Sequence, residues 1–247
     1  MIEIPFLHPT TPFPDVSTAL DDPDGLLAFG GGLDVNRLFT AYSHGIFPWF
    51  SEDEPILWWS PSSRAIIYLK DFHTSRSLRK LINKKRYRVT LDADFKTVIE
   101  HCANIPRSYP GSSELSGTWI TENMMLAYQA LHEAGLAHSV EVWEDNTIVG
   151  GLYGVAIGKI FCGESMFHTK TDTSKLALSA LVKHMQKFDL AFIDCQLPTP
   201  HLASLGAKPI KRERFIRELR DNNLTCDSKG YLLDSFCAIW KKQDITP

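Results

Sequence analysis

The sequence predicts an α+β fold in which strands and helices are mixed along the chain. Three observations support this class. Segments typical of strands and of helices are interleaved, two consecutive strands in the middle form a hairpin around Asp145-Asn146, and the order is not a strict strand–helix–strand repeat. The 247 residues suit one large domain, or one domain with a smaller lobe. Apolar residues at 44% and charged residues at 22% are typical of a globular protein.

The first 62 residues are rich in proline, glycine and aromatic residues. We expect residues 1–62 to form a small N-terminal domain and residues 63–247 to form the larger, catalytic one. Proline fixes φ and lacks a backbone donor, so the prolines between positions 5 and 14 indicate an extended lead-in. Gly30-Gly31-Gly32 predicts a turn, and a short helix is expected at 36–43, with Gly45 near its end.

The elements beyond residue 62 follow from composition and apolar pattern. Leu78, Leu81 and Ile82 give one helix an apolar side, and Thr121 and Gly135 are typical first and last signals of another. Proline, glycine and serine predict a loop at 106–117. The expected strands are 65–69, 86–91, 139–144, 147–156, 159–163 and 191–196. The expected helices are 75–83, 95–102, 121–134, 174–186 and 212–220.

Several classes of protein are excluded by what the sequence lacks. No apolar run approaches the roughly 18–20 residues that cross a bilayer, and residues 1–5 have no basic or apolar leader, so we expect a cytoplasmic protein. Five cysteines without a C-x-x-C pair predict reduced thiols. No His or Cys motif has metal-binding spacing, and neither a Walker motif nor GxGxxG occurs. We therefore expect neither a metal nor a cofactor.

Charge is unevenly distributed. The net charge is −3, yet residues 64–88 contain nine basic residues and one acid, and a second basic cluster lies between Lys208 and Arg220. A sign bias of this size favours a site for nucleic-acid phosphates, which would position the nucleic acid without reading its sequence. The alternative is a solvated helix face. The basic side chains that we expect to contact a nucleic acid are Arg76, Arg79, Lys80, Lys84, Lys85 and Arg86.

A carboxylate and an amide lie two residues apart in the strand Phe192-Ile193-Asp194-Cys195-Gln196. Side chains alternate between the faces of a strand, so Asp194 and Gln196 are expected to share one face. Together they could hold a polar substrate at the strand end. The alternative is that Asp194 caps a turn and Gln196 is solvated.

An acidic residue stands among aromatic and sulfur-containing side chains at Phe161-Cys162-Gly163-Glu164-Ser165-Met166-Phe167. A buried acid needs partners or a shifted pKa, which makes Glu164 a candidate site residue. An exposed Glu in a turn is the alternative. Gly-Glu-Ser is not the nucleophile turn G-x-S-x-G, so Ser165 is not expected to be a nucleophile.

Four tryptophans occur within about 70 residues: Trp49, Trp58, Trp59 and Trp119. Stacking on a nucleobase would contribute roughly 1–3 kcal/mol per base. Ordinary core packing is the alternative for each of them.

Nine motifs together resemble the leucyl/phenylalanyl-tRNA–protein transferase family over roughly residues 1–220. They are GLLAFGGGL (25–33), AYSHGIFPWF (41–50), PILWWSP (55–61), TWI (118–120), AHSVEVW (137–143), VGGLYGV (149–155), FCGESMF (161–167), DCQ (194–196) and HLASLGA (201–207). The resemblance implies a GNAT-like C-terminal domain beside a smaller N-terminal one, and a monomer. It implies transfer of Leu or Phe, and also Met, from aminoacyl-tRNA to proteins that begin with Arg or Lys, which marks them for N-end rule degradation.

The resemblance also implies roles for individual residues. Asp194 and Gln196 match the residues assigned to the reaction, and Glu164 matches a pocket residue important for activity. Residues near the terminal adenosine and aminoacyl group are matched by Trp49 and Trp119. The apolar side-chain pocket is matched by Leu152, Phe161 and Ile193. This chain has Leu152 where the family commonly has Met, and Gly32 where an acidic turn residue is common.

The resulting hypothesis is that the Gln196 side-chain oxygen accepts a hydrogen bond from the attacking amine, while Asp194 orients Gln196. The acceptor α-amine must be neutral to attack, and its ordinary pKa near 7.7–8.0 leaves a neutral fraction at cellular pH. The substrate ester is already activated, so no ATP is needed.

Two alternatives remain at this point. An acyl-CoA-dependent N-acetyltransferase would need a pyrophosphate turn of the type R/Q-x-x-G-x-G/A, which the sequence lacks. A non-enzymatic tRNA-binding module would explain the basic stretch but not Asp194, Gln196 and Glu164.

Overall fold

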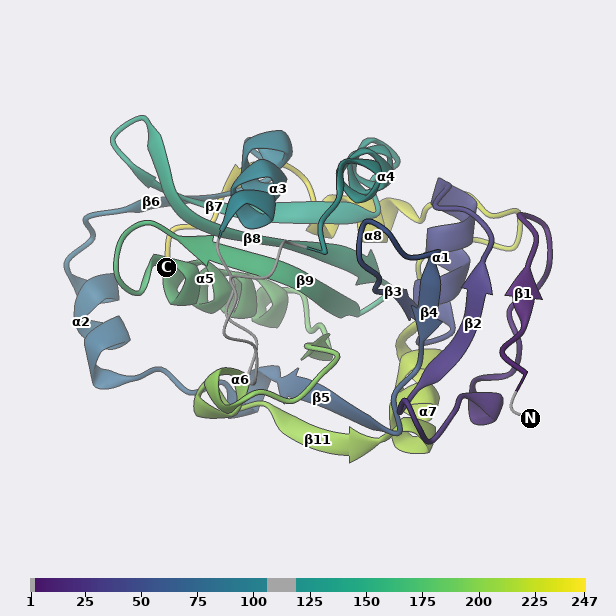
Figure 1. Cartoon of the computed structure of the whole chain (residues 1–247). Coiled ribbons are helices and arrows are strands. Elements are labelled where there is room, and N and C mark those ends of the chain that lie inside the picture. The colour runs from purple at the N-terminus through teal and green to yellow at the C-terminus, as the bar shows by residue number, and fades with distance from the viewer. Residues whose placement is uncertain (1–2, 106–118) are drawn as a thin grey trace.

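The computed structural model describes residues 3–105 and 119–247. It contains two sheets, one of four and one of eight strands, with helices on both faces of the larger sheet (Figure 1). This confirms the mixed α+β class. The loop expected at 106–117 lies outside the described residues. Within the described ranges, no helix is long and apolar enough to cross a membrane.

The smaller sheet is built from the first 60 residues. Its strand order is β1-β2-β4-β3, with β1 parallel to β2 and the other pairs antiparallel. The helix α1 (Val35–Ser43), expected at 36–43, begins at Asp34, whose side chain accepts from the Arg37 backbone N–H. The strands were not predicted: β1 (Phe6–Leu7), β3 (Phe47–Pro48) and β4 (Leu57–Trp59) have only two or three residues, and β2 (Leu26–Gly30) has five.

The larger sheet has the order β11-β5-β10-β9-β8-β7-β6-β12. All neighbours are antiparallel except β9 and β10, which are parallel. Its strands are β5 (Ser63–Tyr68), β6 (Arg88–Leu91), β7 (Ala137–Glu144), β8 (Thr147–Ile157), β9 (Ile160–His168), β10 (Phe192–Asp194), β11 (Lys208–Lys211) and β12 (Gln243–Asp244). The other α-helices are α2 (Arg76–Asn83), α3 (Phe95–Asn104), α4 (Glu122–Glu133), α5 (Thr173–Lys187), α6 (Pro200–Ser204), α7 (Arg212–Asn222) and α8 (Asp234–Ile239).

The helices and strands predicted beyond residue 62 are confirmed, with small shifts in their ends. Two differences matter for function: β9 is longer than expected and β10 ends at Asp194. The short elements α6, β11, α8 and β12 have no strong signal in the local sequence.

The last 27 residues complete the core. The side chains of Phe236, Trp240 and Ile245 are buried, and β12 forms the edge strand beside β6. Trp240 stacks on His138 and contacts the Phe161 ring. This segment, whose role the sequence left open, therefore packs behind the strand that carries Glu164.

Two irregularities in the larger sheet open a space at its centre. The pairing of β9 and β10 ends at Asp194↔Cys162, although β9 continues to His168. On the other side of β9, the register with β8 shifts, because Tyr153 pairs with Ser165 and Gly154 pairs with Gly163. Glu164 is the extra residue of this β-bulge. Bulges redirect side chains and interrupt pairing, and this one lies where the two strands separate.

The close packing around the bulge leaves no room for a side chain at Gly154. A Cβ at this position would lie 2.2 Å from the Cys162 carbonyl oxygen and 2.6 Å from the Phe161 ring. Gly154→Ala should therefore lower the unfolding free energy by about 1–3 kcal/mol, the range for overpacking. Denaturant unfolding measures the change. The control is Gly32→Ala, where the nearest atom is an ordinary 3.6 Å away; an equal loss in both variants would contradict this packing.

Candidate active site

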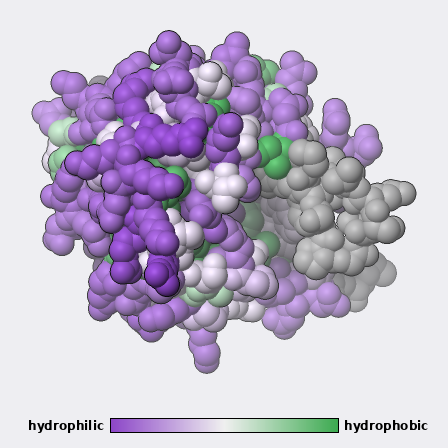
Figure 2. Space-filling view, turned by 90° about the vertical axis from the view of Figure 1, so that its left-hand side faces the viewer, coloured by the Kyte–Doolittle hydropathy of each residue, from purple (hydrophilic) through white to green (hydrophobic). Residues whose placement is uncertain are grey.

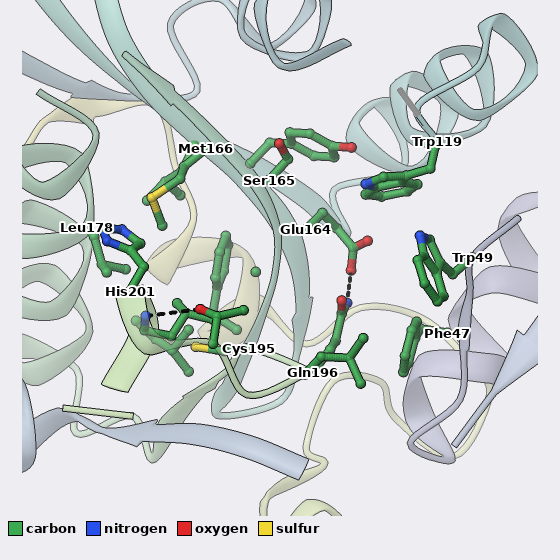
Figure 3. A pocket seen from close by; sticks show the side chains of 18 of the residues that line it. Phe47, Trp49, Trp119, Glu164, Ser165, Met166, Leu178, Cys195, Gln196 and His201 are labelled. Carbon is green, nitrogen blue, oxygen red and sulfur yellow. Dashed lines mark hydrogen bonds between the residues drawn. The ribbon is translucent and has the colours of Figure 1, made fainter. Parts of the chain in front are cut away.

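A cavity of about 400 Å³ occupies the space between the separated strands. Figure 3 shows Phe47, Trp49 and Trp119 at one end, Met166, Leu178 and His201 at the other, and Glu164 and Gln196 between them. The lining side chains are predominantly apolar. They come from β3 and the residue after it, Trp119, β8, β9, α5, β10, the segment after β10 and α6.

The aromatic end is formed by two of the four tryptophans. Trp49 is 37% exposed, and the Trp59 indole N–H donates to its carbonyl oxygen at 2.7 Å. Trp119 lines the same end and is half-buried. Trp58, in contrast, is fully buried and donates to the Gly30 carbonyl oxygen, so it is a core residue. Figure 3 shows the two indoles next to each other at this end, where exposed aromatic faces can bind a flat heterocycle.

The other end is an apolar slot. Met166 and Leu178 lie there, and the cavity lining also includes Leu152, Phe161 and Ile193, which are almost completely buried. Cys195 also lines the cavity, but burial raises the pKa of its thiol well above the ordinary value, so the thiol remains protonated and is a poor nucleophile. The slot can therefore hold an apolar group without reacting with it.

The strand end does not have the geometry expected from alternation. β10 stops at Asp194, and Gln196 has a φ of 61°, in the left-handed region. The expectation that Asp194 and Gln196 share a face of the strand was therefore wrong. Ile193, Cys195 and Gln196 line the cavity, whereas Asp194 is fully buried and is not one of the residues that line it. The change of backbone direction redirects the Gln196 side chain.

Asp194 forms a buried ion pair with Arg64. The Arg64 Nε and Nη2 atoms donate to the two carboxylate oxygens at 2.8 and 2.7 Å, and both residues are at most 1% exposed. Burial disfavours the guanidinium charge, but Asp194 outweighs this effect, and the pKa of Arg64 lies above its ordinary value. Asp194 Oδ1 also accepts from the Gln196 backbone N–H at 2.9 Å.

Glu164 has polar partners on each carboxylate oxygen. Oε1 accepts from Gln196 Nε2 at 2.6 Å, and Oε2 accepts from the Tyr128 hydroxyl at 3.0 Å. The Tyr128 hydroxyl is in turn 2.5 Å from the Tyr42 hydroxyl. Burial raises the pKa of Glu164 from 4.5 to about 7, and the nearby Asp194 adds to the rise, while hydrogen bonds from the tyrosines and Gln196 oppose it. Glu164 is thus about half ionised at neutral pH and carries a full negative charge only well above it.

The contact with Glu164 decides which atom of the Gln196 amide faces the cavity. A carboxylate can only accept hydrogen bonds, so it binds the amide NH₂ and leaves the amide oxygen on the other side. The Gln196 Oε1 atom makes no hydrogen bond with any residue that the structure describes. The site therefore presents one fixed acceptor between the tryptophans and the apolar slot.

The structure brings together seven of the eight reaction and substrate residues that the sequence pointed to. The cavity is lined by Trp49, Trp119, Leu152, Phe161, Glu164, Ile193 and Gln196. Sequence reasoning missed Arg64, Tyr42 and Tyr128. Arg64 was counted within the basic stretch, and nothing in its local sequence distinguishes it from its exposed neighbours. The tyrosines lie on α1 and α4, far from Glu164 along the chain.

The six basic residues singled out from the sequence lie apart from the cavity. All six are exposed, three on α2 and three just after it, and Arg86 forms an ion pair with Glu144. Figure 2 shows that hydrophilic residues cover most of this side of the molecule.

One group in the described chain has the composition of a metal site. Ligand atoms of Asp92, His132 and His138 lie within 4.8 Å of one another. However, His138 Nδ1 is 2.7 Å from Asp92 Oδ2, and His132 Nδ1 is 2.8 Å from the Ala137 carbonyl oxygen. Hydrogen bonds already occupy these nitrogens, and none of the three residues lines the cavity.

A second cavity, of about 680 Å³, is lined by residues that closely follow Trp49 and Trp119 in the sequence. Phe50 follows Trp49, and Thr121 lies two residues after Trp119. Three exposed carboxylates line it, together with apolar side chains that include Leu126. The acidic residues are Glu52, Glu54 and Glu122.

Comparison with known proteins gives consistent matches. Residues 66–220 match the family described as leucyl/phenylalanyl-tRNA protein transferase, and residues 31–62 match its N-terminal domain. The protein of that name from Shewanella baltica (strain OS185) is 52% identical over 87% of this chain and 90% of its own length. The corresponding figures are 53%, 82% and 87% for Pseudomonas fluorescens (strain Pf0-1), and 48%, 94% and 92% for Pseudoalteromonas translucida (strain TAC 125).

The buried carboxyl of Glu164 should be visible in the pH dependence of stability. Because its folded pKa of about 7 exceeds the ordinary 4.5, its contribution to stability is present below about pH 4.5 and is lost as pH rises through about 7. Glu164→Gln removes this titration. Between pH 4.5 and 8 the unfolding free energy of the wild type should therefore fall relative to that of the variant, by up to about 3 kcal/mol.

Urea unfolding at pH 4.5, 6 and 8 measures this gap. Glu133→Gln, which changes an exposed carboxyl on the helix that carries Tyr128, is the control. A gap between Glu164→Gln and wild type that does not change with pH would contradict the raised pKa.

Proposed function

This chain belongs to the leucyl/phenylalanyl-tRNA–protein transferase family, and we propose that it transfers Leu or Phe, and also Met, from aminoacyl-tRNA to the α-amine of proteins that begin with Arg or Lys. Family membership makes it an aminoacyltransferase and decides against the acetyltransferase and the non-enzymatic binding module. The new N-terminal residue would mark the acceptor for N-end rule degradation in the cytoplasm.

The observation that carries the proposal is the position of Gln196 Oε1. It is a fixed hydrogen-bond acceptor between an aromatic end and an apolar slot. An aminoacyl-adenosine has the same order of parts: a flat base, an ester and an apolar side chain. In this arrangement Trp49 and Trp119 bind the terminal adenine, and the ester carbon lies beside Gln196.

The apolar slot would select the amino acid. One methylene in an apolar pocket is worth only about 1–3 kcal/mol, so side-chain size alone discriminates weakly. Leu, Phe and Met share an unbranched Cβ, whereas Val and Ile are branched there. We infer that the slot wall formed by Leu152, Phe161 and Ile193 rejects the branch by shape.

The reaction then needs little more than positioning. The neutral amine of the acceptor attacks the ester carbon, an N–C bond forms, and the bond from the carbonyl carbon to the ribose oxygen breaks. Gln196 Oε1 accepts a hydrogen bond from the amine and aligns it, which replaces a bimolecular encounter with a local one. An amide is too weak a base to keep the proton, so the proton ends on the departing ribose oxygen.

Asp194 would act indirectly, by holding Gln196 in place rather than by touching the substrate. Its carboxylate is buried and paired with Arg64, and it holds the Gln196 backbone rather than the side chain. The tRNA body would bind the basic patch of Arg76, Arg79, Lys80, Lys84, Lys85 and Arg86. These side chains are exposed and can contact phosphates without reading base sequence.

Single-turnover transfer of labelled Phe from Phe-tRNA to a peptide that begins with Arg tests the proposal. Wild-type protein should form the labelled peptide. Gln196→Ala should lower the transfer rate about 100-fold, the lower range for a positioned proton-accepting group. Binding of Phe-tRNA, measured by filter retention, should stay unchanged.

The matched control is Gln186→Ala. This glutamine donates to the Leu69 carbonyl oxygen and does not line the cavity. It should transfer at the wild-type rate. Absence of transfer by the wild type would refute the function, and a wild-type rate in Gln196→Ala would refute only the assignment of Gln196.

The acidic cavity supports the preference for basic acceptors. A cation on the first residue of the acceptor would meet Glu52, Glu54 and Glu122 beside the aromatic end. Replacing all three by Gln should raise the KM for an Arg-initiated peptide about tenfold, which corresponds to 1.4 kcal/mol of lost binding. Steady-state transfer at saturating Phe-tRNA measures this KM.

Asp53→Asn is the control for this test, because Asp53 is an adjacent acid that does not line the cavity. Its KM should match that of the wild type. Equal KM values in the triple variant and in Asp53→Asn would show that acceptor selection lies elsewhere.

A further inference from the structure

We propose that Arg64 is a positioning residue for the transfer reaction. It holds Gln196 in its working conformation through Asp194, and it also contacts the segment that carries Phe47 and Trp49 at the aromatic end of the cavity. The inference rests on the proposed function. Arg64 does not line the cavity and is 1% exposed, so it cannot touch a substrate. Its effect must pass through the groups that it binds.

The first link is the ion pair. Two guanidinium nitrogens donate to the two Asp194 oxygens in a side-by-side arrangement. Such a pair fixes the plane of the carboxylate as well as its distance. Asp194 Oδ1 is thereby aimed at the backbone N–H of Gln196.

The second link is the backbone of Gln196. A φ of 61° is unfavourable for a residue with a side chain and persists only when the surroundings hold it. Two contacts surround this turn: the Gln196 N–H donates to Asp194, and the Ala65 N–H donates to the Gln196 carbonyl oxygen at 3.0 Å. Ala65 is the residue after Arg64. Both sides of the turn are therefore held from one short segment of β5.

The third link reaches the aromatic wall. Arg64 Nη1 donates to the Gly45 carbonyl oxygen at 3.1 Å, and the guanidinium lies against the Phe47 and Phe215 rings at 4.7 and 4.5 Å. Phe47 lines the cavity, and Trp49 follows two residues later. One guanidinium thus contacts the segment that carries the tryptophan and the carboxylate that holds Gln196.

These contacts need the shape of arginine. A lysine keeps the positive charge, but one ammonium cannot donate side by side to Asp194, reach Gly45 and lie flat between two rings. Arg64→Lys should therefore preserve charge balance and disturb position. Since a displacement of about 1 Å can cost about 100-fold in rate, we expect the single-turnover transfer rate to fall by about 100-fold, with Phe-tRNA affinity changed about twofold at most.

The control is Arg37→Lys. Arg37 is also buried and also lies on an aromatic ring, that of Phe13, but it donates to the Thr11 carbonyl oxygen between β1 and β2, and neither Phe13 nor Thr11 lines the cavity. It should transfer at the wild-type rate. Hydrogen exchange of the Gln196 backbone amide supplies a second readout, and it should be faster in Arg64→Lys and unchanged in Arg37→Lys.

The double variant Arg64→Met/Asp194→Leu separates position from stability. Replacing both members of a buried ion pair by apolar residues of similar volume often preserves or raises stability. We expect its melting temperature to be close to that of the wild type while transfer remains about 100-fold slower. This result would show that the pair orients Gln196 and does more than stabilise the fold.

The outcomes are distinguishable. Wild-type transfer with a slow Arg64→Lys and a slow double variant supports the inference. A wild-type rate in either of these variants overturns it, because the pair would then be dispensable or purely structural. If Arg64→Lys does not fold, the double variant and its exchange rate decide. Failure of the wild type to transfer would instead refute the proposed function.

Discussion

The site depends on the point at which β9 and β10 stop pairing. Parallel strands share hydrogen bonds until Asp194 faces Cys162, and beyond that rung the two chains separate. Backbone groups that leave a sheet need other partners, since unpaired buried N–H and C=O groups are costly. Here the Gln196 N–H turns to the Asp194 side chain, and its carbonyl oxygen to Ala65. The cavity is thus a consequence of how the sheet satisfies its hydrogen bonds where it opens.

The charges around this opening are arranged in two layers. Arg64 and Asp194 are fully buried and neutralise each other behind the cavity wall. Glu164 stands at the wall itself, where no basic residue of the described ranges forms an ion pair with it, and it is stabilised by the Tyr128 hydroxyl and the Gln196 amide. A carboxylate in that position is costly to ionise, which is why burial raises the pKa of Glu164 to about 7. The cost is consistent with a group kept for orientation rather than for stability.

Irregular backbone accounts for the differences between the expected and the observed site. Regular alternation predicted that Asp194 and Gln196 would face the same way, but the left-handed turn at Gln196 breaks the period. The bulge at Glu164 does the same on β9, so that Gly163, Glu164, Ser165 and Met166 all line the cavity. Both irregularities depend on neighbouring strands, and Gly154 permits the bulge because a Cβ there would meet the Cys162 carbonyl oxygen.

The sequence by itself determined the mixed α+β class, most helices and long strands, the family, and Trp49, Trp119, Glu164 and Gln196 as candidates that all line the cavity. These follow from local periodicity and from motifs that are contiguous along the chain. Only the tertiary structure decided that Arg64 pairs with Asp194, that Tyr42 and Tyr128 reach Glu164, and that Gln196 presents its oxygen to the cavity. Those contacts join residues 32 to 130 positions apart, so the local sequence cannot predict them. The orientation of the Gln196 amide depends on such a contact, the one with Glu164.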